Sequence, residues 1–162
     1  MAEPKRVVID YGEFEVEVVV RPKLRAREEM AVPPEAPRER ARGKIAAILD
    51  QMFRIGSVLE PLLPEGVVIY EVVGLGLDEE IQVSDRLVQV PARDDFDIYR
   101  LVDRLSGEYE KVAFFTGDKK LANAVRVQVA RKGRRNVEVH YMPPSEFPGR
   151  TQMIEAILKR LG

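Results

Sequence analysis

The chain has 162 residues, of which 45% are apolar and 33% charged, and its 26 basic and 27 acidic residues give a net charge of −1. This length predicts one domain, and the apolar content is high enough for a buried core. The chain has no Cys and a single His, His140, which excludes disulfide scaffolds, thiolate zinc sites, thiol catalysis and His-pair metal sites.

The composition also bears on source and compartment. Arg is frequent, Asn is scarce and Trp is absent, a pattern of dense ion pairing that favours a thermophilic source. No apolar run reaches the roughly 20 residues that span a bilayer, and the N-terminal residues lack the apolar core of a signal peptide. We therefore expect a cytoplasmic protein without a membrane segment.

The chain opens with strand-like sequence. Residues 6–9 are mainly apolar, and residues 14–20 alternate between apolar and acidic before becoming apolar, which predicts strands on both sides of residues 10–13. The tetrapeptide at 10–13, Asp-Tyr-Gly-Glu, is either a hairpin turn or a loop at a strand end. Residues 21–43 contain four Pro and many charged residues, which predicts a solvated, flexible arm or insertion.

The middle of the chain changes from a helical to a strand-like pattern. Residues 44–59 carry apolar side chains at helical spacing, and the prolines at 61 and 64 would end the helix. Residues 67–73 form the continuous apolar run of a buried strand, and residues 87–90 predict a short one. The glycines and acids of residues 74–80 predict a loop between them; Gly74-x-Gly76 lacks the third glycine of a dinucleotide site.

The C-terminal half alternates helices with strands. Helices are predicted at 94–106, 119–132 and 150–161, and strands at 111–115 and 137–141. This alternation is typical of βαβ units with a parallel sheet. We therefore expect residues 1–162 to form a single three-layer α/β/α domain with a mostly parallel sheet of about five strands, plus an N-terminal strand and the arm at 21–43.

Acidic residues follow three of the predicted strands. They are Asp10, Asp94, Asp95, Asp97 and Asp118. Ligands of open parallel sheets bind beyond the carboxyl ends of the strands, so these acids would meet at one edge. Oxygen-only clusters suit Mg²⁺ or Mn²⁺. The alternative is that Asp94, Asp95 and Asp118 serve as helix caps and first-turn residues.

Basic residues gather in the segment that follows Asp118. Residues 119–135 contain seven Arg or Lys and no acid, and four of the cations lie opposite the apolar stripe of the predicted helix: Lys119, Lys120, Arg126 and Arg131. Beside an acidic metal edge, such a patch would hold a phosphate backbone. The alternative is a solvated face that pairs with acidic neighbours. Phe114 and Phe115 lie in a predicted core strand, so no aromatic surface for stacking bases is indicated.

The C-terminal half resembles a nuclease family. The segment FFTGDKKLANAVRVQVARKGRRNVEVHY resembles the C-terminal core of PIN-like nucleases, especially their NYN branch, in which an apolar strand ends in Ser/Thr-Gly-Asp and a helix follows. The preceding DDFDIYRLVDRLSGEYEKV is similar to the acid-headed helix of the family. The sequence VVID at 7–10 is similar to its first strand, which ends in a metal-binding Asp, although residues 11–13 lack the Asn, Ser or Thr that the family carries there.

The resemblance covers residues 87–141 and, over a shorter stretch, residues 5–10. It implies a metal-dependent endoribonuclease that hydrolyses RNA phosphodiesters with Mg²⁺ or Mn²⁺. The implied metal ligands are Asp10, Asp95 and Asp118, with Asp94 and Asp97 as alternates. The implied phosphate contacts are Lys119, Lys120, Arg126 and Arg131.

A second hypothesis is a non-catalytic PIN-like module that binds RNA or a protein. On this hypothesis the apolar strand from Val16 to Val20 offers an edge for pairing with a partner protein or a second copy of the chain.

Overall fold

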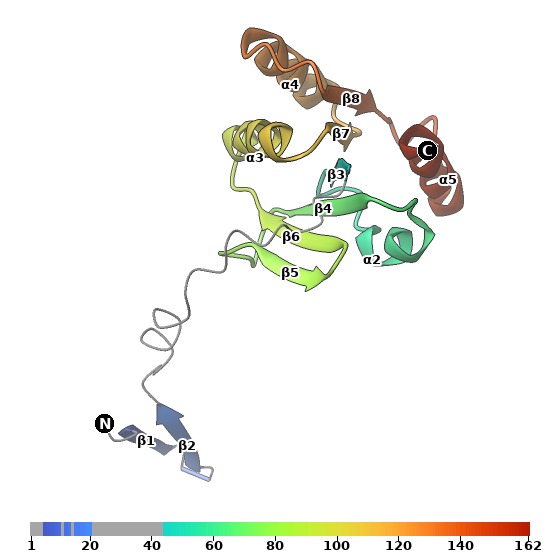
Figure 1. Ribbon diagram of the computed structural model, residues 1–162. Coiled ribbons are helices and arrows are strands. Elements are labelled where there is room, and N and C mark those ends of the chain that lie inside the picture. Colours follow the sequence, from blue (N-terminus) through green and yellow to red (C-terminus); the bar gives the residue numbers. More distant parts are fainter. Residues whose placement is uncertain (1–4, 11, 14, 21–43) are drawn as a thin grey trace. The chain divides into compact units, whose positions relative to one another are not determined.

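The computed structural model describes residues 5–10, 12–13, 15–20 and 44–162. The predictions made for the arm at 21–43 therefore lie outside the described residues. Contacts divide the chain into two compact units, residues 1–40 and 41–162 (Figure 1). Among the described residues, no helix combines the length and the apolar character needed to cross a membrane.

In the first unit, β1 (Lys5–Asp10) and β2 (Glu15–Val20) form an antiparallel hairpin in which Asp10 is opposite Glu15. Gly12, in the turn, has φ +85°, a conformation that glycine adopts without strain. The hairpin alternative for residues 10–13 is thus confirmed. The prediction that Asp10 ends a strand of the parallel sheet is wrong, because β1 belongs to this separate two-stranded sheet.

The second unit is built on a six-stranded sheet with the order β5-β6-β4-β3-β7-β8. All neighbouring strands are parallel except β5 and β6. Its strands are β3 (Ile45–Leu49), β4 (Val67–Val73), β5 (Ile81–Ser84), β6 (Leu87–Pro91), β7 (Lys111–Thr116) and β8 (Val137–Tyr141). This arrangement confirms the predicted α/β class with a mostly parallel sheet, and the strands at 67–73, 111–115 and 137–141 run parallel as their sequence predicts.

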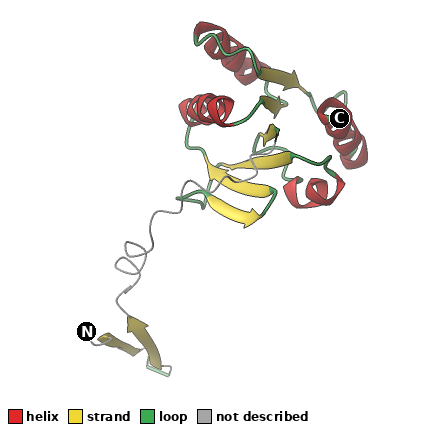
Figure 2. Cartoon of the chain, viewed as in Figure 1, coloured by secondary structure: helices red, strands yellow, loops and turns green. Residues whose placement is uncertain are grey.

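Helices cover both faces of this sheet (Figure 2). They are α2 (Gly56–Leu59), the 3₁₀ helix η1 (Glu60–Leu62), α3 (Asp95–Glu108), α4 (Lys119–Arg131) and α5 (Arg150–Leu161). Helices α3 and α4 lie on one face, and α2 and α5 lie on the other. The unit therefore has the three layers that the sequence predicts.

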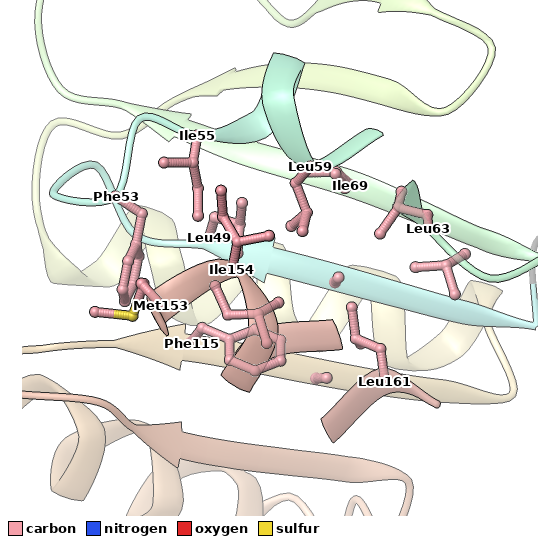
Figure 3. Packing of buried hydrophobic residues seen from close by; sticks show 14 of the residues in the cluster. Leu49, Phe53, Ile55, Leu59, Leu63, Ile69, Phe115, Met153, Ile154 and Leu161 are labelled. Carbon is pink, nitrogen blue, oxygen red and sulfur yellow. The ribbon is translucent and has the colours of Figure 1, made fainter. Parts of the chain in front are cut away.

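Each face of the sheet has its own apolar core. On the face of α2 and α5, Leu49 and Phe115 from the sheet pack with Leu59 and Ile154 from the helices (Figure 3). On the other face, α3 and α4 pack on the sheet in a second cluster. Burial of apolar area of this kind is the main favourable contribution to folding.

The helix predicted at 44–59 is wrong. Its first part is the strand β3, which occupies the centre of the sheet between β4 and β7. Residues 46–49 of this strand are fully buried, because helices cover both faces of the sheet. A strand buried on both faces is apolar at every position, and such a run cannot be distinguished from a buried helix by its periodicity. Only α2 and η1, further along the segment, are helical.

Candidate functional site

The strand order reverses at the centre of the sheet, between β3 and β7. From β3 the chain continues through α2 on one face to β4, and from β7 it continues through α4 on the opposite face to β8. In open parallel sheets, ligands bind in the crevice that such a reversal leaves at the carboxyl ends of the strands. Asp50 follows β3 at this point, and Gly117 and Asp118 follow β7.

Asp50 is a buried carboxylate, with only 7% of its surface exposed. Its Oδ2 accepts a hydrogen bond of 2.7 Å from the Thr116 hydroxyl, and its Oδ1 accepts one of 2.8 Å from the backbone N–H of Gln51. The backbone N–H of Asp50 donates to the carbonyl of Phe115 at 3.0 Å. A buried carboxylate requires donors of this kind, because desolvation without them is strongly unfavourable. The carboxylate is therefore held in one orientation at the edge of the sheet.

Asp118 is linked to Asp50 by hydrogen bonds to the same residue, Thr116. The buried Thr116 hydroxyl, which donates to Asp50, also accepts the backbone N–H of Asp118 at 3.1 Å. Asp118 Oδ1 caps α4 by accepting from the N–H groups of Lys120 at 2.9 Å and Leu121 at 3.1 Å. The capping alternative for Asp118 is thus confirmed. Its Oδ2 makes no hydrogen bond or ion pair with the described residues, so one carboxylate oxygen remains for a ligand.

The acids at the start of α3 are mainly engaged in capping. Asp94 Oδ1 accepts the N–H of Asp97 at 3.0 Å, and Asp97 Oδ2 accepts the N–H of Arg93 at 2.8 Å. The capping alternative for Asp94 is also confirmed. Asp95 is exposed and has no partner among the described side chains. These acids follow β6, which is two strands, or about 10 Å, across the sheet from β3.

The structure thus places Asp94, Asp95 and Asp118 at the predicted edge, with Asp50 at its centre. In the described part of the chain, no group of three Asp, Glu or His side chains is close enough together to hold a metal ion. Asp50 was missed by the sequence analysis, although its signal is present. The signal is an acid after an apolar run: Asp50 directly follows the run IAAIL, and Asp118 follows the run KVAFFT by two residues.

The Met52 side chain packs against the turn at Gly117. Its N–H donates to Met52 Sδ at 3.1 Å, and a Cβ atom at this position would lie 2.5 Å from that sulfur and 3.1 Å from the carbonyl oxygen of Met142. A Cβ atom there would displace the Met52 side chain and sit tightly against the Met142 carbonyl, so this arrangement of the turn favours glycine. Met52, itself part-exposed, therefore covers the turn at the carboxyl edge of the sheet.

The four predicted phosphate contacts are all exposed on α4: Lys119, Lys120, Arg126 and Arg131. None of the four forms an ion pair with a described carboxylate. The alternative of pairing with acidic neighbours holds instead for Lys132 and Arg134, further along the same segment, which both pair with Asp103. Arg126 bonds to Asn123 Oδ1 at 3.2 Å and to the carbonyl of Val139 at 3.3 Å. Lys119 and Lys120 lie in the first turn of α4, next to Asp118, whereas Arg131 is at the opposite end of the helix, about 18 Å away.

Searches for similar proteins return no match to any family model, curated protein or solved structure.

Proposed function

We propose that the second unit is a metal-dependent endoribonuclease whose active edge is formed by Asp50 and Asp118. The observation that carries this proposal is the buried Asp50 carboxylate at the strand reversal, which shares the Thr116 hydroxyl with Asp118. Asp50 thereby takes the role that the sequence assigned to Asp10. The Thr116-Gly117-Asp118 turn is the motif on which the resemblance to PIN-like nucleases depends.

The residues at this edge fit a hard divalent cation. Each oxygen of Asp50 accepts one hydrogen bond and retains a second lone pair, and Asp118 Oδ2 has no partner among the described residues. Mg²⁺ is usually held by one or two carboxylates together with substrate phosphates and water, so two protein carboxylates are sufficient. Asp95 lies at the same edge but after β6, two strands from β3, and Asp94 and Asp97 remain in the cap of α3.

A bound cation at this edge would polarise the phosphodiester and lower the pKa of a water molecule. The chain's own residues orient the reactants. Thr116 fixes the Asp50 carboxylate, and Lys119 and Lys120, at the positive end of α4, attract the phosphate backbone. Hydrolysis forms a bond from phosphorus to the water oxygen and breaks the bond to a ribose oxygen, which leaves with a proton. Lys119 and Lys120 would stabilise the negative charge that develops on the phosphoryl oxygens.

Thermal melts with and without Mn²⁺ test the proposal. At a Mn²⁺ concentration about ten times its Kd, binding adds roughly 1.4 kcal/mol to the free energy of unfolding, which raises Tm by roughly 3–6 °C. We expect this rise in the wild type and in a control, Asp78→Asn, which removes an exposed loop carboxylate. The rise should disappear in Asp50→Asn and in Asp118→Asn. Both variants should still fold, because Asn can accept the same backbone hydrogen bonds and caps a helix about as well as Asp.

Cleavage of a labelled RNA in Mn²⁺ provides the second measurement. The wild type and Asp78→Asn should cleave the RNA, and EDTA, Asp50→Asn or Asp118→Asn should stop cleavage. If Mn²⁺ stabilises none of the four proteins and the wild type does not cleave RNA, the nuclease proposal is wrong.

The alternative function, a binding or assembly module, draws on the hairpin. Val8, Ile9 and Val19 are exposed there, and β2 has no second neighbouring strand among the described residues. An isolated two-stranded hairpin is at best marginally stable in water, so a covering partner would stabilise it. A full-length chain that sediments as an oligomer, and becomes a monomer without residues 1–40, would favour this function.

A further inference from the structure

A groove with a volume of about 300 Å³ lies between α3 and α4. Its apolar lining comes from Val102 on α3 and from Val125 and Val129 on α4, and its aromatic lining comes from Phe96 and Tyr99 on α3. A cavity of this size is at the lower end of the range for small-molecule sites. We call it the α3–α4 groove.

The aromatic side of the groove is unusually exposed. Phe96 has 63% of its surface accessible and contacts Tyr99 edge-to-face, with ring centroids 5.7 Å apart and an angle of 78° between the ring planes. The face of an exposed Phe ring is a surface on which a flat apolar group can stack. Phe96 directly follows Asp95 in the first turn of α3, so this end of the groove opens at the carboxyl edge of the sheet.

The opposite end of the groove carries excess positive charge. Asp103 is the only carboxylate that lines the groove in the described part of the chain, and it pairs with Lys132 Nζ at 3.3 Å and with Arg134 Nε at 3.0 Å. Although partial burial acts to raise the pKa of Asp103, hydrogen bonds from these two cations outweigh it and lower that pKa. Two cations therefore share one negative charge, which leaves a net positive charge at this end. Arg100 and Arg104 also line the groove, and each pairs with a carboxylate outside it: Arg100 with Asp97 at 3.3 Å and Arg104 with Glu80 at 2.8 Å.

We propose that the α3–α4 groove binds single-stranded RNA, with a base stacked on Phe96 and the phosphate backbone contacting Lys132 and Arg134. The inference rests on the proposed nuclease function for the class of ligand. An exposed aromatic ring beside cations that exceed the acids is the combination that binds single strands, because every base has a flat face and every linkage carries a negative charge. An apolar peptide would leave the positive charge that Asp103 does not neutralise on Lys132 and Arg134 without a partner, which favours the nucleic acid.

The groove also lies where a strand bound at the active edge could continue. Helix α3 begins at the carboxyl edge of the sheet, after β6, and α4 begins there after β7. The groove follows both helices away from Asp50 and Asp118 towards Lys132, which immediately follows α4. A strand positioned by Lys119 and Lys120 could therefore extend into the groove without crossing the sheet.

The test is the affinity for a fluorescent single-stranded RNA of about ten nucleotides, measured by anisotropy in EDTA, where metal-dependent cleavage is stopped. We expect Phe96→Ala to weaken binding roughly 5- to 150-fold, the range for loss of one base–aromatic stack. Lys132→Ala should weaken binding and also reduce its salt dependence. The matched controls are Leu75→Ala, which removes an exposed apolar side chain from a loop, and Lys159→Ala, which removes an exposed cation from α5. Both should bind as the wild type does.

Two further measurements distinguish RNA binding by the groove from the proposed nuclease activity. Asp50→Asn should lose cleavage and retain binding in the groove, and Phe96→Ala should not change the affinity for duplex RNA, whose bases are already stacked. If wild type and Asp50→Asn bind the RNA equally and neither cleaves it, RNA binding by the groove is supported and the nuclease proposal is wrong. If Phe96→Ala and Lys132→Ala bind as tightly as the controls, the proposal is wrong. If the wild type does not bind the single strand at all, RNA is not the occupant, and a protein partner becomes the better hypothesis.

Discussion

At the scale of single residues, Thr116 links the two acids of the proposed site. Its hydroxyl is fully buried, donates to the Asp50 carboxylate and accepts the N–H of Asp118. Hydrogen bonds to charged groups contribute about 1.5–3 kcal/mol each, and a buried carboxylate that loses its donor is left with the penalty of desolvation. The same contacts that stabilise the turn therefore also orient the acids, so the stability of the turn and the geometry of the proposed site depend on one side chain.

His140 makes the stability of the fold depend on pH. Its ring stacks on Phe115, with centroids 4.8 Å apart and 17° between the planes, and 19% of the side chain is exposed. Burial lowers its pKa below 6.5, and the nearby cations Arg160 and Lys111 act in the same direction. Glu138, whose Oε2 lies 3.3 Å from His140 Nε2 but is poorly aligned for a hydrogen bond, acts to raise the pKa.

The direction of the effect follows from proton uptake. Below about pH 6.5 the unfolded chain binds a proton at His140 that the folded protein still excludes, so the free energy of unfolding falls as the pH drops towards the folded-state pKa. We expect the wild type to lose more stability than His140→Gln between about pH 7.5 and about pH 5.5, measured by urea denaturation. The carboxylates lower the free energy of unfolding equally in both proteins, so the difference between the two losses reports on His140 alone. A difference that is the same at both pH values would show that His140 titrates alike in the folded and unfolded states.

At the scale of the elements, the sequence predicts best those that are amphipathic or bounded by turn residues. The strands at 67–73 and 137–141 and the helix at 150–161 have the same bounds in the structure. Gly133 follows the end of α4 with φ +65°, and the N–H groups of Gly133 and Arg134 bond to the last turn, which is how glycine commonly ends a helix.

The errors have two causes. Strand β3 is central and buried on both faces, so its sequence carries no alternation. Strand β5 alternates apolar and polar residues, but it has only four residues and lies exposed at the edge of the sheet, so its pattern is too short to identify a strand. The misassigned β3 concealed Asp50, because an acid inside a predicted helix would not be placed at a sheet edge. The α3–α4 groove was also missed, since the pairing of two helices and the exposure of Phe96 depend on tertiary packing.

The entry to α2 depends on a glycine that contacts a carboxylate. The N–H of Gly56 donates to Glu71 Oε2 at 2.8 Å, and a Cβ atom at Gly56 would overlap that oxygen and lie 2.9 Å from Leu87 Cδ1. We expect Gly56→Ala to lower the free energy of unfolding by about 1–3 kcal/mol, the usual effect of overpacking.

Gly107→Ala in α3 is the matched control, because a Cβ there meets no atom within 4 Å. It should stabilise the protein by about 0.5–1 kcal/mol, since Ala is the better helix former. Equal urea midpoints for the two variants would contradict the contact with Glu71.

At the scale of the whole molecule, the site and both cores belong to one unit. The carboxylates proposed to hold the metal, the cations of α4 and the α3–α4 groove all lie within residues 41–162, as do the two apolar clusters. Asp10 belongs to the hairpin in the other unit. The proposed first metal ligand, Asp50, lies in the second unit, whereas the ligand expected from the sequence, Asp10, lies in the first. Metal binding therefore requires residues 1–40 only if Asp10 is the ligand.

A fragment of residues 41–162 distinguishes these assignments. Since it retains the complete six-stranded sheet and both cores, we expect it to fold alone, with a Tm within about 2 °C of the full chain, which corresponds to less than about 1 kcal/mol. If Asp50 and Asp118 hold the metal, the fragment should keep the Mn²⁺-dependent rise in Tm and the cleavage of RNA, and Asp10→Asn in the full chain should leave both unchanged. If Asp10 is a ligand, the fragment and Asp10→Asn should both lose the Mn²⁺ effect while Tm without metal stays the same. A fragment that melts far below the full chain would show instead that residues 1–40 stabilise the second unit, and the full-length Asp10→Asn measurement would then decide between the two ligands.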